Sequence, residues 1–211
     1  MSLFEFQEPA VLDEELLMLR TQVRRFVDEE VMPQGEKWEE QGFVPRDIFL
    51  KMGELGFLGM RHPVEYGGSG LGATASVVFG EEVARSTFGG FATAVTVHSD
   101  MSVGHIAHRG THEQKSKYLP AACAGEKVGC ICVTEPHAGS DVAGLKTRAE
   151  PKNGGWVVNG TKTFITNGVY GDIYIVAART DPEAKGSRGI SLFIVDKGTT
   201  GFTIGRKFEK H

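Results

Sequence analysis

The sequence predicts an α+β protein, in which an all-α helical part is followed by an incomplete antiparallel β-barrel or sandwich. Up to about residue 126, apolar residues recur at three- and four-residue steps, the period of an amphipathic helix. From Lys127 onward, short runs rich in β-branched and aromatic residues alternate with Asn-Gly dipeptides, the pattern of hairpins. Because helices come first and strands second, we divide the chain into a helical domain (residues 1–126) and a β domain (residues 127–211).

The first two helices follow from their apolar stripes and their end signals. A helix over residues 13–30 would be capped by an aspartate at its start and ended by Pro33 and Gly35. Its stripe consists of Leu16, Leu19, Val23, Phe26, Val27 and Val31. A second helix is expected to open at Pro45 and to close at Gly56.

Three further helices complete the predicted helical domain. We expect one over residues 73–86 and one, rich in small residues, over residues 91–108. The last begins at Thr111, which has capping-box spacing to Gln114. A glycine-rich stretch, residues 65–72, precedes the first of these helices. We interpret it as a plain loop, because no strand leads into it and the spacing of a phosphate-binding loop is missing.

The second part is predicted to be β-structure. Asn-Gly dipeptides at residues 153, 159 and 167 mark three hairpin-type turns. Around them lie the expected strands, at residues 128–134, 156–158, 163–166, 172–178, 190–195 and 202–204. Short strands separated by such turns favour an antiparallel arrangement.

Composition excludes several classes of protein. The 211 residues carry 23 basic and 27 acidic side chains, a net charge of −4 without a basic run, which argues against nucleic-acid binding. No apolar stretch approaches the roughly 18–20 residues that a membrane span needs. The acidic N-terminus resembles neither a signal peptide nor a transit peptide, so we expect a cytoplasmic protein.

The cysteines and histidines do not predict a metal site. Three cysteines are an odd number without zinc-site spacing, and we expect them to be reduced and structural. His105, His108 and His112 could share one helix face, but no acidic residue or H-E-x-x-H pattern supports metal binding there.

Two segments of the β domain carry more specific chemistry. In residues 133–141 a β-like stretch enters a turn that holds the hydroxyls of Thr134 and Ser140 beside small residues, so the backbone can approach a ligand closely. In residues 159–168 an aromatic, an aliphatic and a hydroxyl side chain lie between two Asn-Gly turns. A capped turn and an ordinary hairpin would also explain these segments.

Together the two segments resemble the acyl-CoA dehydrogenase family, FAD enzymes that oxidise acyl-CoA thioesters to 2,3-enoyl-CoA. The family motif T-E-P-x-A-G-S-D stands at Thr134 to Asp141, and N-G-x-K-x-[WF]-I-T-N-G stands at Asn159 to Gly168. The stretch from Glu65 to Gly68 is similar to a loop of the family's helical domain.

The resemblance implies a cofactor, a substrate and partners. FAD would be bound by Ile131, Cys132, Val133, Thr134, Gly139, Ser140, Phe164, Ile165 and Thr166. Ser140 and Ser187 would contact the CoA part of an acyl-CoA substrate. An electron-transfer flavoprotein would reoxidise the flavin, and the complete enzyme would be a homotetramer.

The resemblance also has departures. Phe164 stands where the family more often has tryptophan, and His137 stands where it often has glycine. The family's catalytic base is a glutamate on a C-terminal helical domain that these residues do not contain, so we assign no catalytic residue and expect a structural role for Glu135. We therefore expect a fragment that is inactive by itself and binds FAD weakly.

Two alternatives stay open at this point. The chain could belong to an enzyme of the same fold with other chemistry, such as a flavin monooxygenase or a nitroalkane oxidase. It could also be a non-catalytic subunit that needs a partner chain.

Overall fold

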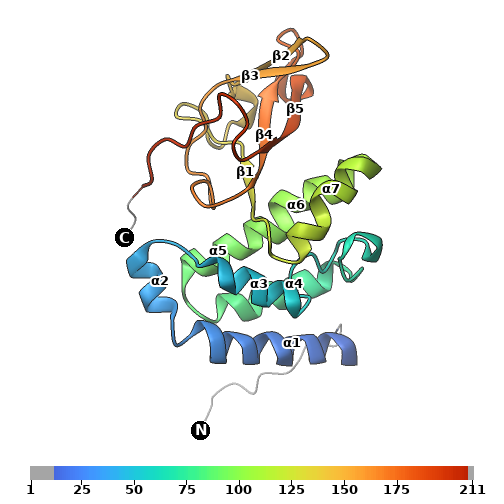
Figure 1. Cartoon of the computed structure of the whole chain (residues 1–211), viewed down its shortest axis with the longest axis vertical. Helices are drawn as coiled ribbons and strands as arrows, with labels where there is room; N and C mark the ends of the chain where they lie inside the picture. Colours follow the sequence, from blue (N-terminus) through green and yellow to red (C-terminus); the bar gives the residue numbers. More distant parts are fainter. Residues whose placement is uncertain (1–11, 209–211) are drawn as a thin grey trace.

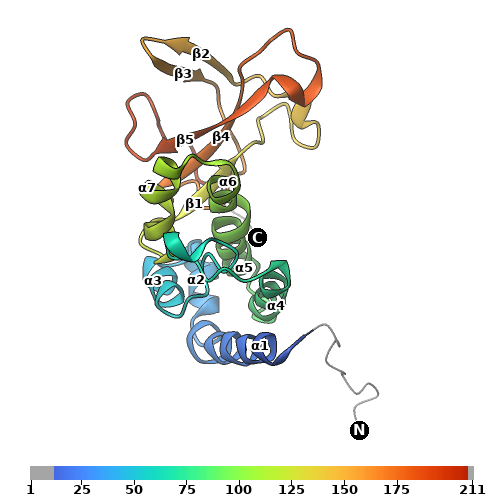
Figure 2. The same cartoon turned by 90° about the vertical axis from the view of Figure 1, so that its right-hand side faces the viewer.

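A computed structural model describes residues 12–208 as a layer of helices beneath a mixed β-sheet (Figure 1). Helix α1 (Glu14–Phe26) lies at the end of the helical layer farthest from the sheet, and α6 (Val103–Arg109) and α7 (His112–Cys123) lie at the end next to it (Figures 1 and 2). The hairpin formed by β2 (Arg148–Lys152) and β3 (Gly155–Asn159) is the part of the sheet most distant from the helices. The α+β prediction is confirmed in this arrangement.

The predicted helices form, with some differences in their interior. The helical elements are α1 (Glu14–Phe26), a π-helical turn η1 (Val27–Val31), α2 (Gly35–Gln41), α3 (Arg46–Glu54), a 3₁₀ turn η2 (Val64–Tyr66), α4 (Ala73–Ala84), α5 (Gly89–Thr96), a π-helical turn η3 (Val97–Ser102), α6 (Val103–Arg109) and α7 (His112–Cys123). The helix expected over residues 91–108 is therefore interrupted by π-helical geometry in its middle. The capping box is confirmed, because Thr111 Oγ1 accepts from Gln114 N and Gln114 Oε1 accepts from Thr111 N.

Helix α2 was not expected from the sequence. Pro33 and Gly35 indicated the end of a helix, but the chain turns and starts a new one at Gly35. This helix has seven residues, and Trp38 is its one large apolar side chain, so it lacks a periodic stripe. Gly35 is required by packing, since a Cβ there would lie 1.9 Å from the Phe88 ring.

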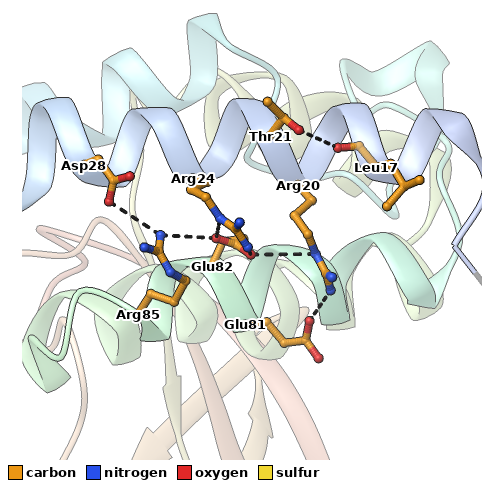
Figure 3. A network of polar contacts seen from close by, with 8 residues as sticks. All are labelled: Leu17, Arg20, Thr21, Arg24, Asp28, Glu81, Glu82 and Arg85. Carbon is orange, nitrogen blue, oxygen red and sulfur yellow. Dashed lines mark hydrogen bonds and ion pairs between the residues drawn. The ribbon is translucent and has the colours of Figure 1, made fainter. Parts of the chain in front are cut away.

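A charge network joins α1 to α4 (Figure 3). Arg24 makes two hydrogen bonds to the carboxylate of Glu82, of 2.9 and 2.7 Å, and Arg20 pairs with both Glu81 and Glu82. Glu82 is only 2% exposed. Burial alone would raise its pKa, but the hydrogen bonds and charge of Arg24 outweigh burial and lower the pKa. The two helices are thus held by ionised groups as well as by apolar contact.

The sheet is mixed, and the expectation of an antiparallel barrel or sandwich is wrong. Its strands are β1 (Gly129–Cys132), β2 (Arg148–Lys152), β3 (Gly155–Asn159), β4 (Ile173–Arg179) and β5 (Ile190–Asp196). The pairs β1·β4 and β2·β4 are parallel, whereas β2·β3 and β4·β5 are antiparallel. Parallel pairing arises because the chain after β3 returns through a long loop to the start of β1 before β4 begins.

Two expected strands do not form, and only one of the three Asn-Gly turns closes a hairpin. Asn153 and Gly154 both have positive φ, 52° and 78°, and join β2 to β3 as predicted. Residues 163–166 are not a strand, because Phe164 has a φ of 55°, which breaks an extended backbone. Residues 202–204 also pair with no strand in the described part of the chain.

Two of the buried apolar clusters show what holds the helical layer together and what joins it to the sheet. One lies within the helical layer and includes Phe26, Phe57 and Phe79. The other packs Ile106 and Leu119, with other residues of α6 and α7, against Ile173 and Ile175 of β4. No helix within residues 12–208 is long and apolar enough to cross a membrane.

Candidate cofactor and substrate site

The two motif segments, residues 133–141 and 159–168, lie side by side at the end of β1. The Thr163 N–H donates to the Thr134 carbonyl oxygen over 2.9 Å, and Lys162 Nζ donates to the Val133 carbonyl oxygen over 3.0 Å. The sequence predicted the importance of both segments, and the fold brings them together.

Glu135 lies beneath this junction as a buried acceptor. Its carboxylate accepts hydrogen bonds from Lys162 Nζ at 2.7 Å, Lys146 N at 2.7 Å and Thr147 N at 2.9 Å. Burial would raise its pKa, but these donors outweigh burial and lower the pKa to about 2. His137 Nε2 lies 3.3 Å from the same carboxylate. A carboxylate so strongly stabilised in its ionised form is a poor proton acceptor, which agrees with a structural role.

The turn after Glu135 leaves its backbone open. Glu135 and Ala138 exchange two backbone hydrogen bonds, which close the turn. Gly139 and Ser140 follow on the surface, and a Cβ at Gly139 would meet no atom within 4 Å. Thr134 is half-buried at the entrance of the turn. Accessible backbone and two hydroxyls are thus available to a ligand.

Phe164 projects from the second segment. Its side chain is 61% exposed at a position where φ is 55°, and its ring centroid is 5.0 Å from that of Phe208. Ile165 turns the other way and packs on the apolar cluster of β1 and β4 that includes Cys132 and Tyr174. The left-handed backbone at Phe164 therefore places its aromatic ring outside the core, while the neighbouring Ile165 side chain packs against the core.

Asn167 fixes the end of this segment, and sequence reasoning gave it no separate role. Its side-chain Nδ2 donates to the carbonyl oxygens of Ala94 at 2.9 Å and Gly129 at 3.3 Å. One amide thus connects the segment to α5 and to β1. The Asn-Gly dipeptide was a signal for a turn, but contact with α5 could not be deduced from it.

A hollow of about 1710 Å³ opens between the helical layer and the sheet. Of the nine predicted cofactor residues, Cys132, Phe164, Ile165 and Thr166 line it. The other five lie outside its lining, namely Ile131, Val133, Thr134, Gly139 and Ser140. The predicted CoA contact Ser187 also lies outside it. Ser187 belongs to the exposed 3₁₀ turn η5 (Gly186–Gly189), which contacts the 3₁₀ turn η4 (Val142–Gly144) shortly after Ser140. The predicted residues thus form two neighbouring regions.

The other candidate groups have structural positions. His105 and His108 lie on α6 and His112 begins α7, so the expectation of a shared helix face is wrong, because Gly110 ends α6 between them. Within residues 12–208 no group of three or more His, Cys, Asp or Glu side chains could hold a metal ion. All three cysteines are buried and free. The glycine-rich stretch lies between α3 and α4, and after its first two residues, which belong to η2, it is a loop as predicted.

Comparison with known proteins identifies the family. Residues 13–126 match the family model described as acyl-CoA dehydrogenase, N-terminal domain, and residues 130–211 match that described as acyl-CoA dehydrogenase, middle domain. The mitochondrial isovaleryl-CoA dehydrogenase of Arabidopsis thaliana is 38% identical over 95% of this chain and 49% of its own length. The mitochondrial long-chain specific acyl-CoA dehydrogenase of Mus musculus is 42% identical over 92% of this chain and 45% of its own length.

A solved structure agrees with these matches. The crystal structure of an acyl-CoA dehydrogenase complexed with FAD from Bacillus anthracis is 35% identical and superposes with a TM-score of 0.88, over 99% of this chain and 36% of that one. The chain spans about half the length of the curated relatives it matches. Two family domains in the expected order, together with the shared fold, show that this chain belongs to the acyl-CoA dehydrogenase family.

Proposed function

We propose that this chain contributes the helical and flavin-binding parts of an FAD-dependent acyl-CoA dehydrogenase. The complete protein would oxidise acyl-CoA thioesters to 2,3-enoyl-CoA. The observation that carries the proposal is the Thr163–Thr134 backbone hydrogen bond, because it joins the two family motifs into one surface beside the exposed Phe164 ring.

The residues of this surface fit FAD. A planar ring system needs an apolar or aromatic neighbour, which Phe164 offers, and hydrogen-bonding groups at its edge, which Thr134 and Thr166 offer. The phosphates and the ribityl chain need accessible backbone and hydroxyls, which Gly139 and Ser140 offer.

Residues of β1 would act differently from those of the turn. Cys132 is buried in one apolar cluster, and Ile131 packs against the cluster that faces α6 and α7. We therefore assign Ile131, Cys132 and Val133 a role through their backbone. The FAD complex of the Bacillus anthracis relative supports the identity of the cofactor.

Bound FAD would supply a hydride acceptor for the β-carbon of the substrate. The residues of this chain would hold and orient the ring, with Ile165 anchoring Phe164 to the sheet. Backbone N–H groups of the 133–141 segment would stabilise negative charge that develops at the ring edge. We place the catalytic base in a part of the complete protein beyond these 211 residues, and we exclude Glu135 because donors saturate its carboxylate.

The substrate class follows from the same assignment. Ser140 and Ser187 would contact the CoA moiety, which all substrates of this class share. An isovaleryl-CoA and a long-chain relative are similarly identical to this chain, 38% and 42%, so we leave the acyl group open. We further propose an electron-transfer flavoprotein as the redox partner and a homotetramer for the complete enzyme.

The test uses the full-length protein loaded with FAD. Addition of short-, medium- and long-chain acyl-CoA without oxygen should bleach the oxidised flavin with at least one of them. No bleaching with any chain length would refute the proposal. Oxygen consumption without an electron-transfer partner would instead indicate a monooxygenase or nitroalkane oxidase, and co-purification with a homologous chain that carries the base would indicate a non-catalytic subunit.

A matched pair of variants tests the assignment of the surface. Phe164→Ala should lower the FAD content of the purified protein, because it removes the aromatic neighbour of the ring. Leu55→Ala removes an apolar side chain that is 50% exposed at the end of α3, outside the lining of the hollow, and should leave FAD content unchanged. Equal FAD contents in the two variants would contradict the assignment.

A further inference from the structure

We propose that Arg179 is a positioning residue that fixes two substrate loops relative to each other. These are the Ser140 loop (residues 138–144) and the Ser187 loop (residues 184–189). That the loops bind CoA rests on the proposed function, whereas the contacts of Arg179 are independent of it.

The backbone of Arg179 is held from several sides. It is the last residue of β4, where it pairs with Ile190 of β5 and Arg148 of β2. Its N–H donates to the Thr147 carbonyl oxygen over 2.8 Å. The side chain therefore starts from a backbone position that is paired to both neighbouring strands.

The guanidinium reaches both loops at once. Nη2 donates to the Ala143 carbonyl oxygen over 2.7 Å, in the turn that follows Ser140. Nη1 lies 3.5 Å from the carbonyl oxygens of Ala184 and Gly186, on either side of Lys185 and just before Ser187. A guanidinium carries donors on separate nitrogens in a fixed plane, so it can bridge acceptors that lie farther apart than the three donors of a single ammonium nitrogen can reach.

The Ser187 loop is shaped to admit the guanidinium. Gly189 is buried, and a Cβ there would lie 3.1 Å from Arg179 Nη1 and 2.2 Å from the Asp181 carbonyl oxygen. A larger residue would push the loop away from the arginine. The two short helices η4 and η5 are in contact, so a shift of either loop would be felt by the other.

Among the residues that the structure describes, the charge of Arg179 has no anionic partner nearby. Within residues 12–208 no carboxylate lies within ion-pair distance of its guanidinium, and all its hydrogen bonds go to carbonyl oxygens. A positive charge satisfied in this way still attracts phosphate groups. The same side chain would thus set the distance between Ser140 and Ser187 and favour an anionic ligand between them.

The experiment compares Arg179→Met, Arg179→Lys and Arg148→Met in the full-length, FAD-loaded protein. Arg148 is the exposed cross-strand partner of Arg179, and no substrate role is assigned to it. Arg179→Met should raise KM for acyl-CoA about tenfold or more, the effect of losing charge-assisted hydrogen bonds. The value of kcat and the FAD content should stay close to those of the parent, and Arg148→Met should change neither KM nor kcat. Arg179→Lys, which keeps the charge but not the fork, should give an intermediate KM.

A second readout does not depend on activity. In the ligand-free protein, Arg179→Met should speed amide hydrogen exchange in both loops together and leave the hairpin at residues 152–155 unchanged. The proposal would be overturned if Arg179→Met changed neither KM nor amide hydrogen exchange in the two loops. It would also be overturned if hydrogen exchange rose throughout the protein and kcat and kcat/KM fell by equal factors. If the parent protein does not turn over acyl-CoA, the proposed function fails, whereas the exchange data still decide whether Arg179 couples the loops.

Discussion

Lys162 Nζ lies 2.7 Å from Glu135 Oε1, and the two side chains are only 9% and 2% exposed. This ion pair connects the two motif segments, because one residue comes from each. It is stabilised further by backbone donors to the same carboxylate. The candidate flavin surface is therefore built on a buried, ionised pair.

Lys162→Met should destabilise the protein strongly. The change removes the cation and leaves the Glu135 carboxylate buried, which costs about 3–5 kcal/mol in comparable pairs. Lys117→Met is the matched control, since Lys117 pairs with Asp196 but is 58% exposed, and it should cost less than about 1 kcal/mol. Free energies of unfolding from denaturant titration at neutral pH give the comparison, and equal losses would contradict a special role for the buried pair.

Glu82→Gln should destabilise the helical layer far more than Glu81→Gln. Both carboxylates pair with Arg20, but Glu82 has a 3% exposed side chain and also binds Arg24, whereas Glu81 is 55% exposed (Figure 3). We expect a loss of about 3 kcal/mol for Glu82→Gln and below about 1 kcal/mol for Glu81→Gln. Thermal and denaturant unfolding of the two variants provide the measurement. A difference smaller than the experimental error would show that the network adds nothing beyond packing.

His98 should make stability depend on pH below neutrality. Its Nδ1 accepts from Gly129 N at 2.9 Å, while Nε2 donates to the Ala122 carbonyl oxygen at 3.1 Å, an arrangement that requires the neutral ring. Burial lowers its pKa from 6.5 to about 4. Because the folded pKa is lowered, the stabilisation is complete above pH 6.5 and is lost as the pH falls toward 4.

The measurement is the difference in unfolding free energy between the parent protein and His98→Asn. Since the variant has no imidazole here, the difference should shrink by about 3 kcal/mol between pH 6.5 and pH 4. Taking the difference between the two proteins cancels the pH-dependent contributions of titratable groups that both contain. One of these is His62, whose pKa is also lowered by burial. Between pH 7 and pH 9 the difference should stay constant, and a constant difference down to pH 4 would refute the assignment.

Asn167→Asp should loosen the junction between the second motif segment and the helical layer. Aspartate still tolerates the φ of 62°, but it replaces the donor Nδ2 by an oxygen that faces two carbonyl oxygens. We expect a loss of about 2 kcal/mol, together with weaker retention of FAD by the full-length protein. Asn153→Asp, at the positive-φ position of the hairpin, should leave FAD retention unchanged. Equal FAD retention in both variants would contradict the role of this contact.

Different parts of the molecule could be predicted from the sequence to different degrees. The capping box at Thr111 and the Asn153-Gly154 turn depend on neighbouring residues, and both were predicted correctly. Helix α2 and the left-handed backbone at Phe164 were missed, because packing against distant elements overrides the local pattern.

The candidate site shows the same division. The motif residues were found because the two segments resemble the motifs of a known family. The contacts of the folded chain alone gave roles to Asn167, Lys162 and Arg179. Each of these side chains donates at least one hydrogen bond to a backbone or carboxylate oxygen more than 25 residues away. Such partners leave no periodic signal.

By itself, the sequence determined the α+β order of the elements, the approximate bounds of most helices and of four of the five strands, and the two motif segments. These properties depend on interactions within a few residues, or on a resemblance to the motifs of a known family. Only the tertiary structure decided that β1 and β4 run parallel, that the motif segments meet at Thr134 and Thr163, and that Glu135 is buried in its ionised form. Strand direction and burial depend on contacts between residues that lie tens of positions apart in the sequence. The fold with the lowest free energy is decided by all of these contacts together.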